Sequence, residues 1–385
     1  MEYSKKSILL TTTSRAFGSI QRYIQGPGEL NKVFEYGKKY GSRFLFLVDS
    51  GVFDMIRDQV EAIEDRCGCS ALFHSFYGEC CQENVDLLAN VVKGTDCDLI
   101  LGVGGGKVLD TVKLVADAVD LPRIIVPTSA SSDAPAADWA AVYDTRGVFI
   151  GAHATNRSTE LVLVDSTIIS RAPARLFASG IADALVTWYE AMANERSLTP
   201  NNIGRGYLRS LAGMAIARES HDILLRDGIR AYEAVKAKLL TPAVENVIEA
   251  NILLSGLGFM NAGCACAHGI HNGISALENG EEFLHGEKVA FGLICQLILE
   301  NAPQKELETV MAFLDALNLP VTLEQLHIAC SDENLDIIVN YMMNQSLLIY
   351  REPVPATDET VRMIIRTADL FGRQYLEHKH RNREN

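Results

Sequence analysis

The sequence lacks an uninterrupted apolar run of about 18 residues, the length that a membrane-spanning helix needs. Its opening stretch, MEYSKKSILLTTTSR, has a short apolar run followed by Arg15, without the cleavage pattern of a signal peptide. The nine cysteines show none of the regular spacings that mark a small disulfide-bonded domain. We therefore expect a cytoplasmic protein with reduced thiols and no membrane partner.

Positive charge is also scarce, with 35 lysines and arginines against 49 aspartates and glutamates and a net charge of −14. The basic residues are scattered apart from one short stretch, HKHRNREN, so a broad nucleic-acid-binding surface is not expected. The chain has 385 residues, of which 48% are hydrophobic and 22% charged. This is the balance of a globular protein with room for two domains.

The first 170 residues alternate between strand-like and helix-like segments. The apolar runs that read as strands are residues 43–51, 70–78, the start of 97–120, 122–130 and 160–169. Segments with apolar residues at helical spacing follow several of these runs, which indicates a largely parallel sheet covered by helices on both faces. The sequence therefore predicts an α/β N-terminal domain over residues 1–170.

Residues 171–385 have a different character. Long segments such as GIADALVTWYEAMANE and HGEKVAFGLICQLILEN carry the 3.6-residue apolar periodicity of helices, and strand candidates nearly vanish. This pattern predicts an all-helical C-terminal domain. We expect the two domains to pack across a cleft, and clefts between domains are favoured places for ligands.

Three consecutive glycines, Gly104 to Gly106, stand between a predicted strand and a predicted helix. Such a turn lets a pyrophosphate approach the free N–H groups of the helix start, although a plain tight turn has the same sequence. The motif is not a Walker A loop, because Leu101 and Val108 replace its first glycine and its hydroxyl residue. It does not have the GxGxxG spacing either.

Polar residues follow two other predicted strands. Asp49 ends one strand, where an acidic residue can bind the ribose hydroxyls of NAD or simply start a turn. The loop over residues 126–144 offers side chains that can bind phosphate or ribose, or cap the next helix. These are Thr128, Ser129, Ser131, Ser132 and Asp133.

The stretch NAGCACAHGIHNGISALENGEEFLHGEKVAFG contains two cysteines and three histidines. On a helix that includes residues 262–272, Cys264, His268 and His271 would share one face, and His285 precedes the next predicted helix. A structural zinc site usually has four ligands, often in CxxC pairs, and CACAH has no second cysteine pair downstream. The pattern favours histidine ligands of a catalytic metal, with purely structural histidines as the alternative.

Asp183 is a charged residue among apolar neighbours on a predicted helix. An ionised carboxylate that is buried there needs a compensating partner. A metal ion would provide one, and so would an arginine or a helix N-terminus. The residues alone leave these alternatives open.

The chain matches a known pattern from about residue 20 to residue 320, through six motifs in a fixed order: GVGGGKVLDTVK, PTSASSDAP, LVLVDSTII, GIADALVTWYEA, AHGIHNG and HGEKVAFG. Through them the chain resembles the glycerol dehydrogenase family, within the metal-dependent, iron-containing alcohol dehydrogenase superfamily, whose fold is related to dehydroquinate synthase. The resemblance implies an N-terminal dinucleotide-binding domain and a helical C-terminal domain with the metal between them. It also implies NAD as the cofactor and a homo-oligomer.

The resemblance implies a set of site residues, carried over position by position. Zinc would be bound by Asp183, His268 and His285, with both cysteines of CACAH as bystanders. Asp133 would hold substrate hydroxyls, and His271 would line the site and, with water, offer a route for the proton. The implied cofactor residues are Asp49, Gly105, Gly106, Lys107, Asp110, Thr128, Ser131 and Tyr143.

The chain departs from the family pattern at a few positions. Thr187 stands four residues after Asp183, where iron-type members have a histidine, and this favours a three-ligand zinc site over iron. Ala137, Asp138 and Trp139 are not the residues of a typical glycerol dehydrogenase. Trp139 is placed to stack on the nicotinamide or to narrow the pocket, which would shift the substrate from glycerol.

The implied reaction is a zinc-dependent and NAD-dependent oxidation of glycerol, or a related vicinal diol, to the hydroxyketone, with glycerol giving dihydroxyacetone. Three protein ligands would leave room on the ion for the hydroxyl groups of the substrate. A Lewis-acidic ion would lower the pKa of such a hydroxyl, and hydride would then pass to NAD. The rivals are a same-fold dehydrogenase for a hydroxy acid or glycerol 1-phosphate, a dehydroquinate synthase-type cyclase and a non-catalytic binding protein. Asp133 would repel the carboxylate of a hydroxy acid. In the motifs that flank the metal, Lys288 is the only lysine or arginine that could bind a substrate phosphate, so a small polyol substrate is favoured.

Overall fold

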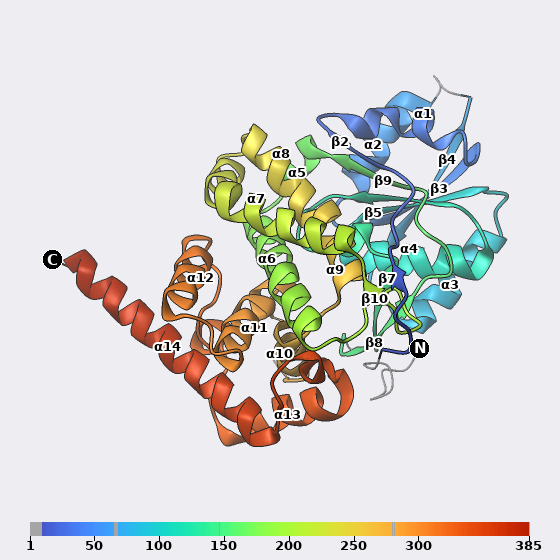
Figure 1. Cartoon of the computed structure of the whole chain (residues 1–385). Helices are drawn as coiled ribbons and strands as arrows, with labels where there is room; N and C mark the ends of the chain where they lie inside the picture. Colours follow the sequence, from blue (N-terminus) through green and yellow to red (C-terminus); the bar gives the residue numbers. More distant parts are fainter. Residues whose placement is uncertain (1–9, 65–67, 146, 279, 281, 385) are drawn as a thin grey trace.

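The structure is a computed structural model that describes residues 10–64, 68–145, 147–278, 280 and 282–384. It has two parts, a parallel sheet flanked by helices and a helical part that packs against it (Figure 1). The last helix, α14 (Asp358–Glu384), runs along the outer edge of the helical part and its end points away from the sheet (Figure 1).

Among the described residues, six parallel strands form the main sheet in the order β2-β9-β6-β5-β3-β4. They are β2 Tyr23–Gly26, β3 Arg43–Asp49, β4 Ser70–Phe76, β5 Leu99–Gly104, β6 Arg123–Pro127 and β9 Leu161–Asp165. Strands β5, β6 and β9 are buried along their whole length, as expected for a sheet covered on both faces.

Helices cover both faces of this sheet. They are η1 Glu29–Lys32, α1 Val33–Gly37, α2 Phe53–Glu64, α3 Gln82–Lys93, α4 Gly106–Val119 and α5 Ser166–Arg171. Successive side chains of a strand point to opposite faces. In β3, Phe44 and Phe46 therefore pack with α1 and α2, whereas Leu45 and Leu47 pack with α3 and α4.

Two short strand pairs lie outside the main sheet. Strands β7 (Trp139–Tyr143) and β8 (Phe149–Ala154) form an antiparallel hairpin with an irregularity beside Tyr143. Strand β1 (Arg15–Ala16) pairs in parallel with β10 (Leu208–Arg209), which belongs to the second half of the chain. Neither pair was predicted, and β10 is a two-residue exception to the all-helical prediction.

The helical part follows the main sheet. Its elements are α6 Ala174–Arg196, α7 Leu211–Lys236, α8 Pro242–Glu249, η3 Ala250–Leu254, α9 Ser255–Ala262, α10 Cys266–Ser275, α11 His285–Leu299, α12 Gln304–Ala316, η4 Glu324–Leu326, α13 Asp332–Tyr341, η5 Met342–Ser346, η6 Leu348–Arg351 and α14. No single helix of the described residues is long and apolar enough to cross a membrane. One bent pair, Pro242–Ala262 with Cys266–Ser275, meets that test by length and composition only.

The predicted fold class is confirmed, because a parallel sheet with helices precedes a helical part. The predicted strands at 43–51, 70–78, 122–130 and 160–169 correspond to β3, β4, β6 and β9, each shorter than predicted. The main sheet ends at Asp165, and the division of the chain at residue 170 stays a prediction.

A close backbone contact joins the two parts near the cavity. A Cβ atom added at Gly180 in α6 would lie 1.8 Å from the carbonyl oxygen of Ala130, in the loop after β6. Only glycine permits this approach. Because Asp183 follows one turn later on α6, the contact holds this helix against the loop that carries Ser131 and Asp133.

Candidate active site

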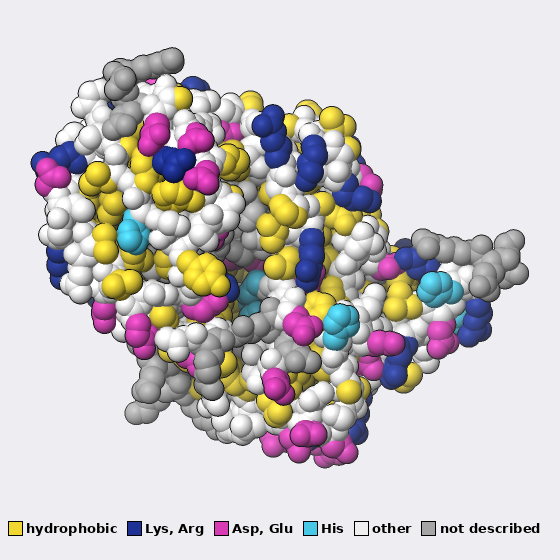
Figure 2. Space-filling model, turned by 180° about the vertical axis from the view of Figure 1, so that it is seen from behind, with side chains coloured by type: hydrophobic (Ala, Val, Ile, Leu, Met, Phe, Trp, Pro, Cys, Tyr) yellow, Lys and Arg dark blue, Asp and Glu magenta, His cyan; other side chains and the backbone are white. Residues whose placement is uncertain are grey.

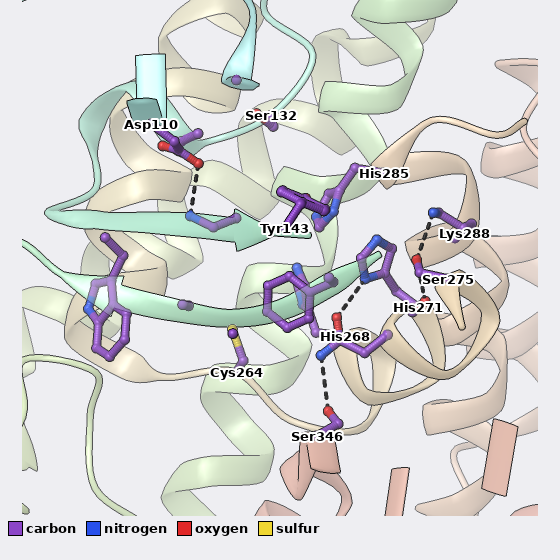
Figure 3. Close-up of a pocket in the computed structure, with 18 of the residues that line it drawn as sticks. Asp110, Ser132, Tyr143, Cys264, His268, His271, Ser275, His285, Lys288 and Ser346 are labelled. Atoms are coloured by element: carbon purple, nitrogen blue, oxygen red, sulfur yellow. Dashed lines mark hydrogen bonds between the residues drawn. The ribbon is translucent and has the colours of Figure 1, made fainter. Parts of the chain in front are cut away.

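A cavity of about 690 Å³ lies between the sheet part and the helical part. Its lining comes from the start of α4, the loop after β6 and the hairpin β7–β8 on one side, and from α10, α11 and residues 341–348 on the other. Figure 2, which views the molecule from the back, shows the surface hollowed between the two parts, with histidine side chains in the hollow. Figure 3 shows Asp110 and Tyr143 on the sheet side of the cavity and Lys288 and Ser346 on the helical side.

Three helices bring Asp183, His268 and His285 together. Asp183 lies inside α6, His268 lies on α10, and His285 is the first residue of α11. Atom Oδ1 of Asp183 is 3.3 Å from Nε2 of His268 and 3.0 Å from Nε2 of His285. One ligand atom from each residue lies within 4.8 Å of the others, an arrangement that could hold a metal ion.

The chemistry of this group fits a divalent cation. Burial acts to raise the pKa of Asp183, but the adjacent His285 and His268 hold it well below its usual range, so the carboxylate stays ionised. Burial acts to lower the pKa of His268, but Glu190 and Asp183 raise it well above the usual value. One carboxylate oxygen and two imidazole nitrogens at a partly buried point are a donor set that zinc and related ions use.

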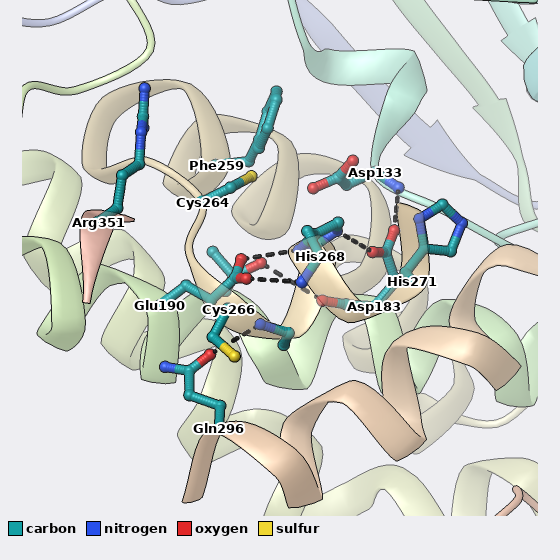
Figure 4. Close-up of polar contacts among 12 residues, drawn as sticks. Asp133, Asp183, Glu190, Phe259, Cys264, Cys266, His268, His271, Gln296 and Arg351 are labelled. Atoms are coloured by element: carbon teal, nitrogen blue, oxygen red, sulfur yellow. Dashed lines mark hydrogen bonds and ion pairs between the residues drawn. The ribbon is translucent and has the colours of Figure 1, made fainter. Parts of the chain in front are cut away.

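Glu190 is a residue of the site that the sequence analysis missed. It lies seven residues, about two helical turns, after Asp183 on α6 and is 1% exposed. Its Oε2 is 2.7 Å from Nδ1 of His268, and its Oε1 accepts a hydrogen bond of 2.9 Å from the backbone N–H of His268 (Figure 4). A carboxylate at Nδ1 favours the tautomer that keeps Nε2 free as a ligand atom.

Cys264 does not share a helix with the histidines, contrary to the prediction. Helix α9 ends at Ala262, Gly263 has φ +98°, and α10 begins only at Cys266. Cys264 nevertheless lines the cavity, and its sulfur forms a second group with Glu190 and His268 whose ligand atoms lie within 4.8 Å of one another. In that group, Nδ1 of His268 is already hydrogen-bonded to Glu190.

Asp133 and His271 flank the group of Asp183, His268 and His285, which we call the candidate metal-ligand group. The backbone N–H of Asp133 donates to Oδ2 of Asp183 over 3.2 Å, and Oγ of Ser255 donates to Oδ2 of Asp133 over 3.0 Å. Burial and the charge of Asp183 raise the pKa of Asp133 to about 7. The ring centroid of His271 is 4.2 Å from that of His285, and burial together with the charge of His285 lowers the pKa of His271.

Five of the eight residues predicted for the cofactor line the cavity. They are Gly106, Lys107, Asp110, Ser131 and Tyr143. Asp110 has both carboxylate oxygens engaged, one with Nζ of Lys113 at 2.9 Å and one with the backbone N–H of Ala141 at 3.0 Å. It therefore ties α4 to the hairpin. The ammonium group of Lys107 forms an ion pair with Glu79.

The other three predicted cofactor residues, Asp49, Gly105 and Thr128, are not among the described residues that line the cavity. These three residues lie beside the cavity, where strands β3, β5 and β6 end. Asp49 ends β3 and Gly104 ends β5, and a Cβ atom added at Gly104 would lie 2.6 Å from Cβ of Asp49. The backbone N–H of Thr128 donates to the oxygen of Gly104 over 3.0 Å. The strand order reverses between β3 and β5, and ligands of doubly wound sheets bind at such a point.

The glycine turn leaves open space at the start of α4. A Cβ atom added at Gly105 would meet no heavy atom within 4 Å, and one at Gly106 would meet only Oγ of Ser132 at 3.8 Å. Gly105 has ordinary extended backbone angles, so neither strain nor packing demands glycine there. Open space beside the unpaired N–H groups of a helix start fits the pyrophosphate of a dinucleotide.

The open space beside Gly105 lets us predict how Gly105→Val changes stability and NAD binding. Because the valine side chain would occupy the open space and replace a glycine N-cap, we expect the free energy of unfolding to fall by no more than about 1 kcal/mol. The KM for NAD should rise by at least about tenfold, a loss of about 1.4 kcal/mol of binding. Denaturant unfolding and steady-state kinetics measure the two effects. An unchanged KM for NAD in the folded variant would contradict this placement of the cofactor.

Known proteins resemble this chain along most of its length. The family model for iron-containing alcohol dehydrogenase matches residues 21–166. A glycerol dehydrogenase of Thermotoga maritima is 38% identical over 353 residues, which cover 91% of this chain and 96% of the relative. One from Escherichia coli O6:H1 is 38% identical over 364 residues, 94% of this chain and 99% of the relative. The crystal structure of a probable glycerol dehydrogenase from Sinorhizobium meliloti matches with a TM-score of 0.88 and 41% identity, covering 94% of this chain and 99% of that one.

Proposed function

Because the chain belongs to the glycerol dehydrogenase family of the iron-containing alcohol dehydrogenases, we propose that it oxidises glycerol or a related vicinal diol to the hydroxyketone, with NAD as the hydride acceptor. The observation that carries the proposal is the convergence of Asp183, His268 and His285 on one cavity with the start of α4. One cavity can thus receive both the diol and the nicotinamide end of the cofactor.

Zinc is the ion that we propose for Asp183, His268 and His285. Thr187, where iron-type members have a histidine, is 3% exposed, and its Oγ1 lies 2.9 Å from Oγ of Ser255. It is therefore engaged within the helical part rather than offered as a fourth ligand. When bound, a divalent ion supplies a Lewis acid that lowers the pKa of a substrate hydroxyl.

We propose that Asp133 orients the diol. Ser255 donates to its Oδ2, and no described residue donates a hydrogen bond to its Oδ1. This oxygen can accept a hydrogen bond from the second hydroxyl of a vicinal diol, which fixes the carbon that gives up hydride. This partly buried carboxyl group also disfavours substrates that carry a negative charge next to the hydroxyl.

NAD would bind at the edge of the sheet where the carboxyl ends of the strands lie. Gly106, Lys107, Ser131 and Tyr143 line the cavity beside the start of α4. Asp49 lies next to the glycine turn and accepts a 2.9 Å hydrogen bond from the N–H of Gly51. A carboxylate there suits the ribose hydroxyls of NAD and repels the additional phosphate of NADP.

A phosphorylated substrate fits the cavity poorly. Lys107 and Lys288 are its lining lysines, and no arginine is among the described lining residues. Lys107 is paired with Glu79, and Nζ of Lys288 donates to Oγ of Ser275 and to the oxygen of Gly280. Few positive charges therefore face a bound substrate, which favours a neutral polyol over glycerol 1-phosphate. We further propose that the enzyme is a homo-oligomer of the cytoplasm.

The proposed function is tested by following NADH absorbance with purified, zinc-loaded protein. NAD should be reduced with glycerol or 1,2-propanediol, and NADP should support at least about tenfold lower kcat/KM because of Asp49. The control is the same protein without a diol. Absence of turnover with both diols would overturn the proposal.

A further inference from the structure

Four residues with largely apolar side chains form a connected part of the cavity lining, which we call the end wall. They are Ala137, Trp139, Phe259 and Cys264, and all four line the cavity. Ala137, Trp139 and Phe259 also belong to one hydrophobic cluster. The end wall therefore lies between this hydrophobic cluster and the cavity.

One buried residue, Asn202, contacts three of these residues through its backbone oxygen and its side-chain amide. Asn202 is 3% exposed, and its backbone oxygen accepts a 2.9 Å hydrogen bond from Nε1 of Trp139. Its side-chain Nδ2 donates to the backbone oxygen of Phe259 at 3.1 Å and contacts the sulfur of Cys264 at 3.9 Å. Its Oδ1 accepts a 2.9 Å hydrogen bond from the buried Arg351. Asn202 therefore links Trp139, Phe259 and Cys264 into one unit.

Trp139 has a second anchor on its backbone. Nζ of Lys113, which is fully buried, donates to the oxygen of Trp139 over 2.9 Å and to Oδ1 of Asp110 over 2.9 Å. Trp139 is also paired with Ala154 in the hairpin. With both its ring nitrogen and its backbone held, the indole cannot turn away from the cavity without breaking buried hydrogen bonds.

The end wall begins beside the metal-ligand group. The sulfur of Cys264 lies within 4.8 Å of ligand atoms of His268 and Glu190. Figure 4 shows Phe259, Cys264 and Asp133 on the same side of His268. A diol held by Asp133 and the metal ligands would therefore point its next carbon toward the end wall.

The chemistry of the wall discriminates between substituents on that carbon. The indole N–H is used by Asn202, Ala137 and Phe259 have no polar side-chain atom, and the thiol of Cys264 is a weak hydrogen-bonding group. A third hydroxyl at this wall would lose its water without gaining a partner. A methyl or ethyl group there would instead bury apolar surface.

We propose that the end wall selects short 1,2-alkanediols over glycerol, with Trp139 as the residue that determines specificity. The proposal rests on the proposed function, because it names the substrate class of the same site. It assigns Asn202 and Lys113 as positioning residues, since they act on substrate only through Trp139 and its neighbours.

The first test compares kcat/KM of the zinc-loaded enzyme for glycerol, 1,2-propanediol and 1,2-butanediol at saturating NAD. Both alkanediols should exceed glycerol by at least about tenfold, because they bury an alkyl group against the end wall where glycerol would leave a hydroxyl unpaired. A value for glycerol equal to or above those of the alkanediols would overturn the selection while leaving the proposed function intact. No turnover with any of the three would overturn both.

Two variants test whether the wall is responsible. Trp139→His and Ala137→Ser each add a polar group, and each should move the alkanediol-to-glycerol ratio toward glycerol by at least about fivefold. Ala137→Ser should do so without a change in KM for NAD. Ala137→Ser alters the volume little and serves if Trp139→His fails to fold. The control is Trp188→Phe, which changes the chain's other tryptophan, on α6 and outside the described cavity lining, and should leave the ratio unchanged. An unchanged ratio in folded Ala137→Ser and Trp139→His would assign specificity elsewhere and overturn the proposal.

Discussion

Asp183→Asn will lower kcat/KM for diols by about a thousandfold and will leave the purified protein nearly free of zinc. Asp183 is the carboxylate of the proposed metal-ligand group, and its Oδ1 is within 3.3 Å of Nε2 of both histidines. An amide of the same shape removes the negative charge that a divalent ion requires. The loss of a Lewis acid costs several kcal/mol of transition-state stabilisation, which corresponds to three or more orders of magnitude in rate.

The measurements for Asp183→Asn are zinc content per chain and steady-state NADH formation. Asp222→Asn on α7 is a suitable control, because Asp222 is half-exposed and far along the chain from the ligands. It should keep both zinc and turnover. If Asp183→Asn retained one zinc per chain and more than about a tenth of the activity, this carboxylate would not be a ligand.

Glu190→Gln will weaken zinc binding by about 10- to 100-fold while leaving most of the turnover at saturating zinc. The carboxylate of Glu190 contacts both Nδ1 and the backbone N–H of His268. A neutral amide no longer favours the Nδ1–H tautomer as strongly, and it can present an N–H group to the ring in place of an acceptor. His268 would then be held less firmly as a ligand. We therefore expect a larger change in the dissociation constant for zinc than in kcat at saturating zinc.

Competition with a chelator of known affinity measures this effect as the dissociation constant for zinc. Glu195→Gln is the matched control, since Glu195 lies five residues later on α6 and is exposed. A purely structural role of Glu190 would instead appear as a lower thermal midpoint with unchanged zinc affinity of the folded fraction. That combination would contradict the positioning role.

The fold could be predicted where the apolar pattern is strong. Strands β5, β6 and β9 are buried along their whole length, and their apolar runs are visible in the sequence. The edge strand β2 is four residues long and partly exposed, so it leaves little pattern. The hairpin β7–β8 contains Ala140, Ala141 and Gly151, which have weak strand preference, and its position depends on contacts with α4.

The helix break before α10 shows a limit of periodicity. Residues 262–272 have helical spacing, but Gly263 at φ +98° redirects the chain and separates Cys264 from the helix of His268. The spacing of the two histidines was therefore informative, whereas the assignment of Cys264 to their face was wrong.

The site residues differ in how visible they are from sequence. Asp183 could be singled out because a charge stands among apolar residues, and Glu190 offered the same signal two turns later on the same helix. Asn202 gave no such signal. It lies in an irregular segment between α6 and β10, and its role depends on Trp139, Phe259 and Cys264, which are distant in sequence.

Metal removal and replacement test the central claim most directly. The protein is treated with a chelator, assayed for NAD reduction with 1,2-propanediol, and assayed again after one equivalent of zinc per chain. We expect chelation to abolish turnover and zinc to restore it, with none of the recovery in Asp183→Asn. Turnover that survives complete removal of metal would contradict the assignment of Asp183, His268 and His285 as ligands of a catalytic ion.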